Sequence, residues 1–363
     1  MVCGKEVQSI GKGIGVCPDC IRNRWGESRG PIEHLHARSR ERFLLPVEPP
    51  HSEDGLPCNL CFLGCKMKED EAGYCAVRTG TPSSMKKDGR TRARVSYYFD
   101  PLPTNCVADW VCPGGTGAGY PLYAHTKGPE SGYRNWAVFF EACNFNCLYC
   151  QNWTGFKQSH RSRKGWLSVD DMVRAAPDTA SCVCFFGGDP TPQLPFALRF
   201  SRRILELHPG RIFRICWETN GSMNPAWLKS MVRLSLKSGG CIKVDLKAWN
   251  ANIHYALCGC DNTPVLENFA RLSRWIGQRP DPPLLLASTL LVPGYVDEDE
   301  IYGLASFIAG LSPDIPYSLL GFAPQFSLND FPTTSREQAE ACLDAALNAG
   351  LRRVRIGNSH LLH

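Results

Sequence analysis

Seven short apolar segments recur along the C-terminal part of this 363-residue chain and constrain its fold more than any other feature. The segments span residues 136–141, 181–186, 212–217, 242–246, 284–291, 317–322 and 354–356. Stretches with helical periodicity lie between them, and such alternation is typical of βα units that build a parallel sheet. We therefore expect an α/β fold, although periodicity alone does not distinguish a barrel from an open doubly wound sheet. Capping-box patterns at Ser168/Asp171 and Thr334/Glu337 predict the starts of two helices.

The first 130 residues differ in character from the rest of the chain. They contain nine of the 19 cysteines, with frequent proline and glycine and little sustained periodicity. We predict a cysteine-rich N-terminal domain over residues 1–130 and an α/β domain over residues 131–363. With 43% hydrophobic residues, the chain can bury a substantial core.

Three cysteines with C-x3-C-x2-C spacing follow the first apolar segment: Cys143, Cys147 and Cys150. A [4Fe–4S] cluster is normally held by four thiolates, so three on one short loop would leave an iron open to a substrate or cofactor. Loops at the carboxyl ends of strands are also where α/β barrels place their chemistry. We interpret these three residues, called the triplet below, as ligands of a catalytic cluster; the alternatives are a zinc loop or inert thiols.

With Tyr149 just before its last cysteine, the triplet resembles the motif of the radical S-adenosylmethionine (radical SAM) superfamily. The segment 187–190 resembles the Gly-Gly-Glu-Pro motif of that family, with Asp189 in place of the more usual glutamate. Residues 217–221 and 244–247 resemble strand ends in the activating enzymes of glycyl-radical enzymes. Residues 149–153, 291–294 and 356–358 resemble a branch similar to pyruvate formate-lyase activating enzyme. The resemblance covers roughly residues 135–358 and is specific for the superfamily, not for one substrate.

The resemblance implies a partial (β/α)6 TIM-like barrel that is open on one side for the substrate. It also implies that S-adenosylmethionine binds the open iron of a [4Fe–4S] cluster through its amine and carboxylate. One electron from a low-potential donor, of the flavodoxin or ferredoxin type, would then break a C–S bond under anaerobic conditions. The resulting 5′-deoxyadenosyl radical would abstract hydrogen from a carbon of a protein, a peptide or a small molecule.

The resemblance further assigns residues to the bound S-adenosylmethionine. Gly187, Gly188 and Asp189 would meet the methionyl amine, although the two glycines also suit a tight turn after a strand. Tyr149 would lie beside the adenine, with simple packing as the alternative.

Two acidic positions and a lysine complete the predicted cofactor contacts. Lys247 would lie near the methionyl carboxylate, and it shares a strand face with Asp245, with which it could form an ordinary ion pair. Glu218, Thr219 and Asp245 match positions that bind a monovalent cation in glycyl-radical activating enzymes, but Glu218 replaces an aspartate there.

The spacing of the N-terminal cysteines predicts further metal sites. The C-x2-C pairs Cys17/Cys20 and Cys58/Cys61 are half-sites of mononuclear zinc or iron centres, and together they would complete one such centre. Four more cysteines would then remain for an auxiliary iron–sulfur cluster: Cys65, Cys75, Cys106 and Cys112.

Other groupings of these cysteines stay open. Residues 58–75 could form a self-contained four-cysteine site, with Cys3, Cys17 and Cys20 recruiting Cys106, Cys112 or His36. A purely structural zinc is the alternative for the first centre. Cys258 and Cys260 are expected in a loop, and five further cysteines are predicted to be small buried side chains: Cys182, Cys184, Cys216, Cys241 and Cys342.

Net charge and hydropathy indicate which partners and which location to expect. The net charge is only +5, and we interpret the basic run at residues 86–94 as solvated surface, so no nucleic acid partner is expected. The longest apolar run, 284–292, is shorter than the ~18 residues of a membrane span, and no secretory pattern opens the chain. We expect a cytoplasmic protein with cysteines that bind metal. The rival hypothesis is a non-catalytic, metal-stabilised module for electron transfer or for binding RNA or protein.

Overall fold

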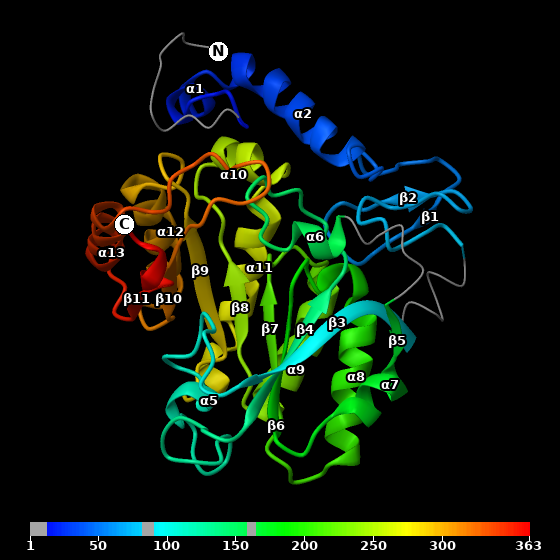
Figure 1. The fold of residues 1–363 in the computed structure, drawn as a ribbon, viewed down its shortest axis with the longest axis vertical. Coiled ribbons are helices and arrows are strands. Elements are labelled where there is room, and N and C mark those ends of the chain that lie inside the picture. Colours follow the sequence, from blue (N-terminus) through cyan, green and yellow to red (C-terminus); the bar gives the residue numbers. More distant parts are fainter. Residues whose placement is uncertain (1–12, 82–90, 158–164) are drawn as a thin grey trace.

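The computed structural model describes residues 13–81, 91–157 and 165–363 (Figure 1). Within these residues, nine strands form one sheet in the order β11-β10-β9-β8-β7-β6-β4-β3-β5. The strands are β3 (Arg92–Pro101), β4 (Arg134–Phe140), β5 (Trp166–Ser168), β6 (Ala180–Phe186), β7 (Arg214–Thr219), β8 (Ile242–Asp245), β9 (Leu285–Leu291), β10 (Tyr317–Gly321) and β11 (Val354–Gly357). Each of the seven expected apolar segments overlaps one of the parallel strands, so the predicted mixed α/β fold with a parallel sheet is confirmed.

β4 and the strands from β6 to β11 pair in parallel. At one edge, β3 pairs antiparallel with β4, and β5 pairs antiparallel with β3. β3 pairs with the whole of β4, in the register Val95 to Phe140 through Pro101 to Arg134. Because β3 belongs to the segment before residue 130, the sheet extends across the predicted domain boundary.

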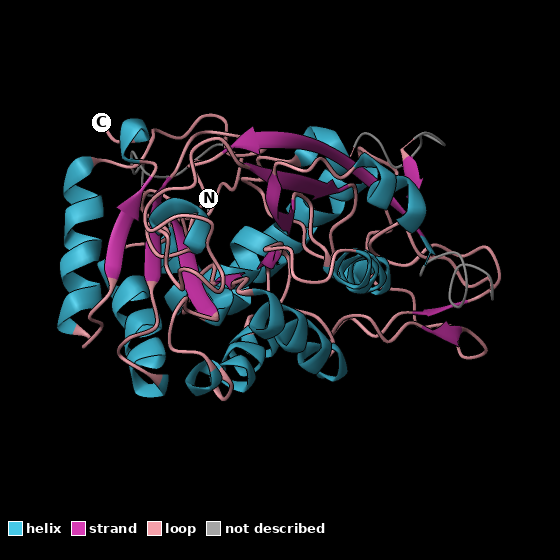
Figure 2. Ribbon diagram, turned by 90° about the horizontal axis from the view of Figure 1, so that it is seen from below, coloured by secondary structure: helices cyan, strands magenta, loops and turns pink. Residues whose placement is uncertain are grey.

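Helices cover the outer side of this row of strands (Figure 2). They are α7 (Val169–Ala175), α8 (Leu194–Leu207), α9 (Leu228–Ser238), α10 (Ala251–Cys258), α11 (Thr263–Ser273), α12 (Glu298–Leu311) and α13 (Arg336–Asn348). Single 3-10 turns lie at η2 (Thr191–Gln193), η3 (Pro225–Trp227), η4 (Ile276–Gln278) and η5 (Ser359–Leu361). In the part of the chain that is described, no helix has both the length and the apolarity needed to cross a membrane.

The helix starts test the two capping predictions. α7 begins with the expected box, because the Ser168 side chain accepts from the Asp171 N–H and the Asp171 carboxylate accepts from the Ser168 N–H. The second prediction is wrong by one residue. Ser335, not Thr334, caps α13 by accepting from the Gln338 N–H. The Thr334 hydroxyl instead donates to the Leu291 carbonyl oxygen and accepts from the Phe322 N–H, so it links two strand ends.

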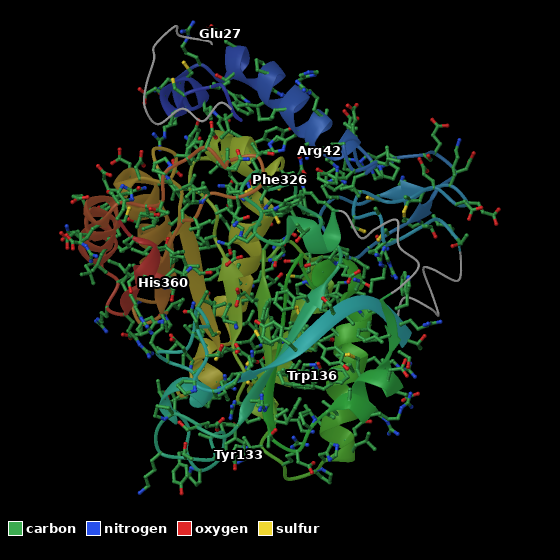
Figure 3. The ribbon with its side chains drawn as sticks, in the orientation of Figure 1. Glu27, Arg42, Tyr133, Trp136, Phe326 and His360 are labelled. Atoms are coloured by element: carbon green, nitrogen blue, oxygen red, sulfur yellow. The ribbon has the colours of Figure 1, made fainter. Side chains whose placement is uncertain are left out.

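Side chains of alternate strand residues divide the sheet into two faces. On the outer face, the rings of Trp136 and Phe185 pack edge-on against Phe200 of α8, and Trp136 is labelled in Figure 3. The opposite face, called the inner face below, carries Cys184, Glu218 and other polar side chains. The inner face therefore faces the cavities described below.

The N-terminal segment wraps around the sheet (Figure 1). It contains α1 (Pro18–Asn23), α2 (Trp25–Glu41), the small hairpin of β1 (Leu56–Pro57) and β2 (Lys66–Met67), and α5 (Pro113–Thr116). The short α6 (Trp153–Phe156) follows the triplet. α1 packs on α10, while β1 and β2 lie beyond the other end of α2, so the long helix separates two groups of N-terminal cysteines.

Candidate active site

One cavity of about 180 Å³ lies at the carboxyl ends of the strands β4, β6, β7 and β8. It is lined by all three cysteines of the triplet and by every residue predicted to contact S-adenosylmethionine. These residues are Cys143, Cys147, Cys150, Tyr149, Gly187, Gly188, Asp189, Glu218, Asp245 and Lys247. Segments that are up to about a hundred residues apart in sequence thus meet at one edge of the sheet, as parallel strands require.

The triplet lies on a loop that follows β4 and rests on the end of α10. The backbone N–H of Asn146 donates to the Cys258 carbonyl oxygen at 2.9 Å, and that of Leu148 donates to the Leu257 carbonyl oxygen at 2.9 Å. The last carbonyls of a helix have no partner within the helix, so this loop satisfies two of them. The helix end and the triplet loop therefore hold each other in place.

Two asparagines between the first two cysteines fix the loop from opposite sides. The Asn144 amide donates to the Ser222 hydroxyl at 2.6 Å and accepts from the Asn220 amide at 2.9 Å. The Asn146 amide donates to His36 Nδ1 at 3.0 Å, and its oxygen accepts from Lys157 Nζ at 2.5 Å. We did not predict these contacts from the sequence; the only signal was the pattern Cys-Asn-Phe-Asn-Cys.

Lys157 is a buried cation next to the triplet. Burial lowers the pKa of its ammonium group to about 8, and the nearby Cys150 sulfur opposes this effect. Its Nζ also lies 4.2 Å from the centroid of the Phe326 ring, which Figure 3 labels near the end of α2. A fixed positive charge at this position favours an anionic group in the cavity.

The three thiols of the triplet differ in acidity. A hydrogen bond with Cys258 lowers the pKa of Cys147 to about 7, although burial opposes the change. Burial raises the pKa of Cys150 to about 12 and raises that of Cys143 as well. Of the three thiols, Cys147 is the most acidic, and the thiolate is the form that binds metal. Three soft sulfur donors with a buried ammonium group nearby fit an anionic iron–sulfur cluster.

The glycine pair after β6 allows the chain to pass tightly against the triplet loop. Gly187 and Gly188 have φ values of +67° and +45°, which disfavour residues with a Cβ. A Cβ at Gly187 would overlap the Phe139 ring, and one at Gly188 would overlap the Phe140 carbonyl oxygen. Both glycines are therefore required by the backbone alone, and they leave open space on the cavity side.

Asp189 connects the ends of β6 and β7. Its carboxylate is buried and accepts from the Thr219 hydroxyl at 3.0 Å, the Asn220 N–H at 2.7 Å and the Thr191 N–H at 2.8 Å. Burial raises its pKa, although each of these hydrogen bonds opposes that effect. The side chain is thus engaged by its own chain, which makes it a positioning group for the turn.

The acidic residues at the cavity also have partners within the chain. Asp245 pairs with Lys247 at 2.8 Å and accepts from the Ser288 hydroxyl at 2.5 Å, while Glu218 pairs with Lys243 at 3.2 Å. The Coulombic attraction of Asp245 raises the pKa of Lys247 despite burial. Two of the three residues expected at a monovalent cation are thus neutralised by lysines.

Tyr149 is buried beside the triplet. Its hydroxyl oxygen lies 3.7 Å from the Cys258 sulfur, and its ring contacts Phe322 edge-on. Cys258 ends α10 and was expected in a loop, so that expectation is wrong. Because Cys258 contacts both Tyr149 and Cys147, it is a further part of the site, to which the sequence analysis assigned no role.

The N-terminal cysteines do not meet as first grouped. Cys17 and Cys20 precede α2, whose 17 residues span about 25 Å, and Cys58 and Cys61 follow it. Instead, one small cavity is lined by the alternative set: Cys58, Cys61, Cys65 and Cys75. The pairing of Cys17/Cys20 with Cys58/Cys61 is therefore corrected, because the rigid helix holds the two pairs apart. Cys3 lies outside the described residues.

Cys106 and Cys112 are likewise separate from Cys65 and Cys75. They line another cavity, together with cysteines of β6, β7 and the start of β8. All 18 cysteines in the described ranges are free thiols. Among those same residues, no three cysteine, histidine or carboxylate side chains close around a single metal ion.

Comparison with known proteins supports the resemblance seen in the sequence. A family model described as the radical SAM superfamily matches residues 137–305, which contain the triplet and the glycine pair. This region of the chain is similar to the radical SAM superfamily. The family match and the relatives named as activating enzymes indicate an enzyme, and the family implies a [4Fe–4S] cluster and S-adenosylmethionine.

Relatives named as activating enzymes support a likeness to the activating-enzyme branch. An uncharacterised protein of Methanocaldococcus jannaschii is 24% identical over 310 residues, which cover 84% of this chain and 82% of the relative. The pyruvate formate-lyase-activating enzyme of Staphylococcus aureus is 29% identical over 232 residues, which cover 60% of this chain and 87% of the enzyme. A crystal structure of Streptococcus suis SuiB bound to S-adenosylmethionine matches with 14% identity and a TM-score of 0.45, over 60% of this chain and 49% of that one.

Proposed function

We propose that this chain reductively cleaves S-adenosylmethionine and uses the resulting 5′-deoxyadenosyl radical to abstract hydrogen from a substrate carbon. The triplet would hold the [4Fe–4S] cluster, and the parallel strands would form the partial (β/α)6 TIM-like barrel. One observation carries the proposal: three thiols, a glycine pair and the Asp245/Lys247 pair line the same cavity at the carboxyl ends of the strands.

The chain's own residues would orient the reactants. When bound, the cluster supplies the electron that splits the C–S bond. Asn144 and Asn146 keep the triplet loop in position, and the glycine pair leaves room for the methionyl group. Lys247 offers a positive charge to a carboxylate, and its contact with Asp245 keeps the ammonium group at the cavity. Leu290 and Leu320 also line this cavity and would limit the access of water to a radical.

A second cavity supports the location of the substrate. It measures about 250 Å³ and shares Gln151, Phe186, Glu218 and Leu320 with the first cavity. Asp100, Asn105 and Arg355 add polar groups to its lining. We propose that the substrate carbon enters from this side, carried by a polar small molecule or by a residue of a protein or peptide. The relatives named as activating enzymes favour the protein or peptide.

We also propose that Cys58, Cys61, Cys65 and Cys75 hold an auxiliary iron–sulfur cluster or a single iron or zinc ion. Asn144 lines their cavity, and it directly follows Cys143 in the chain. A redox-active centre there would lie beside the triplet loop. Electrons from a flavodoxin or ferredoxin type of donor could therefore enter through this site.

The function is tested by product analysis of the purified, anaerobically reconstituted protein. After reduction, we expect conversion of S-adenosylmethionine to 5′-deoxyadenosine and methionine, measured by liquid chromatography. Cys147→Ala should abolish the product, whereas Cys342→Ala, a buried cysteine in α13, should retain it. If the intact protein makes no deoxyadenosine under strict anaerobiosis, the non-catalytic hypothesis replaces the enzyme.

A further inference from the structure

Six cysteines meet on the inner face of the sheet, outside the cavity that the triplet lines. They line a cavity of about 30 Å³ that has no lining residue in common with the triplet cavity. Four come from the strands or their starts, and two come from the loop between β3 and α5 that lies against them. The six are Cys106, Cys112, Cys182, Cys184, Cys216 and Cys241.

Strand register explains how three of these thiols form a row. Cys184 of β6 pairs with Cys216 of β7. Trp217 pairs with Ile242 of β8, so the preceding residue, Cys241, continues the row beside Cys216. Neighbouring strands lie about 4.8 Å apart, and residues two apart share a face, which adds Cys182 to the same side. The sequence places these cysteines far apart, and only the parallel pairing brings them together.

The loop opposite this row is firmly held. The Trp110 indole donates to the Ser318 hydroxyl at 3.1 Å, and that hydroxyl donates to the Val107 carbonyl oxygen at 2.7 Å. Asp109 forms an ion pair with Arg355 of β11 at 2.6 Å. The two loop cysteines are therefore presented to the strand cysteines by a fixed segment attached to β10 and β11.

A buried ammonium group lies among the sulfurs. Nζ of Lys243 is 3.1 Å from the Cys106 sulfur, 2.8 Å from the Cys184 sulfur and 3.2 Å from the Glu218 carboxylate. Its side chain is only 2% exposed, and a buried charge is stable only when its donors are paired. One carboxylate and two sulfurs satisfy all three donors. The positive charge of Lys243 favours the thiolate forms of Cys106 and Cys184, and the thiolate is the form that binds metal.

We propose that this cavity is the site of an iron–sulfur cluster, held by Cys106 and Cys112 from the loop and by cysteines of the strand row. An all-sulfur donor set selects iron–sulfur clusters, zinc or copper(I). Zinc needs four ligands around one point. Here six sulfurs surround a cavity, which is more than a single tetrahedral ion can bind. Lys243 is the charge partner of the anionic cluster.

The proposed cluster site lies next to the proposed substrate cavity. Its cavity shares Thr104, Cys106 and Asn135 with the 250 Å³ cavity, which in turn adjoins the triplet cavity. The proposed cluster would therefore border the substrate cavity. This inference concerns metal binding alone, so it does not depend on whether S-adenosylmethionine is cleaved.

The experiment counts iron and acid-labile sulfide in full-length protein reconstituted anaerobically with iron and sulfide. The background variant carries Cys143→Ala, Cys147→Ala and Cys150→Ala, plus Cys58→Ser and Cys61→Ser, so that neither of the other two proposed sites can hold a cluster. We expect this background to retain one cluster, about four iron for a cubane. Adding Cys106→Ser and Cys112→Ser should remove it, whereas adding Cys342→Ser should not.

Each outcome decides the proposal. The proposal is supported if the background retains iron and loses it only when Cys106 and Cys112 are also replaced. It is also supported by an electron paramagnetic resonance signal of the reduced background that S-adenosylmethionine leaves unchanged. A folded background that binds no iron, or that binds zinc in its place, overturns the proposal. If the background does not fold by circular dichroism, Cys106→Ser/Cys112→Ser is compared with Cys342→Ser in the otherwise unaltered chain. Equal iron in these two proteins would then overturn it.

Discussion

Asp189 lies at the position where the motif that the sequence resembles usually has glutamate. Its carboxylate reaches the Thr219 hydroxyl and the Asn220 N–H, so it joins the ends of two neighbouring strands beneath the cavity. The resemblance predicts a contact with the methionyl amine, and that remains a prediction. The bonds of Asp189 instead point to a role in shaping the turn, which the residue type alone did not reveal.

We expect Asp189→Ala to destabilise the fold by about 2–4 kcal/mol, because it leaves the buried N–H groups of Thr191 and Asn220 without an acceptor. The distorted turn should also weaken S-adenosylmethionine binding by about tenfold or more. Asp189→Asn keeps one acceptor oxygen and should lose less in both respects. Chemical denaturation and isothermal titration calorimetry measure the two effects. An Asp189→Ala protein as stable as the parent would refute this positioning role.

The elements differ in how well the sequence predicted them. The parallel strands and the capping box at Ser168 depend on residues close in the chain, so pattern and spacing sufficed. The contact of α2 with the triplet loop joins His36 to Asn146, residues 110 apart, and no local pattern encodes it. The cysteine groupings failed for the same reason, because strand register and the length of α2 decide which thiols meet.

His36 makes the docking of α2 dependent on pH. Its Nε2–H donates to the Ala256 carbonyl oxygen and its Nδ1 accepts from Asn146, an arrangement that only the neutral ring can make. Burial lowers its pKa to about 4, from 6.5. Between these values the unfolded chain binds the proton and the folded chain does not, so stability falls as pH drops from about 6.5 to 4.

This effect should reach about 3 kcal/mol for His36 at pH 4. Burial also lowers the pKa of His254 to about 4, so it adds a loss in the same direction. Urea denaturation at several pH values should show a shallower acid slope for His36→Gln, although that variant is less stable at neutral pH. The exposed His360, labelled in Figure 3, provides the control, because His360→Gln should leave the slope unchanged. Equal slopes in all three proteins would contradict the assignment to His36.

At the scale of the whole molecule, a buried ion pair borders the cavity of six cysteines. Arg214 of β7 lines the cavity of six cysteines and forms two hydrogen bonds with Glu130, at 2.8 and 2.6 Å. Glu130 also accepts from the Ser181 hydroxyl and the His125 N–H. The pair therefore joins the segment before β4 to β6 and β7, across the predicted domain boundary.

Because both side chains are at most 2% exposed, removing one charge leaves the other buried without a partner. We expect Glu130→Gln to destabilise the protein by about 3–5 kcal/mol. The double variant Glu130→Gln/Arg214→Met removes both charges and should recover part of that loss.

The same pair depends on pH. Burial raises the pKa of Glu130, but the hydrogen bonds and the charge of Arg214 lower it by more, so that the pKa lies below its usual value. The pair thus stabilises the fold at neutral pH and ceases to do so as pH falls through that depressed pKa. Thermal and urea denaturation of the parent, the single variant and the double variant measure the coupling between the two side chains. A double variant less stable than Glu130→Gln would contradict the expected recovery. It would show that other bonds of Arg214, such as that to the Tyr123 carbonyl oxygen, stabilise the fold more than its pairing with Glu130.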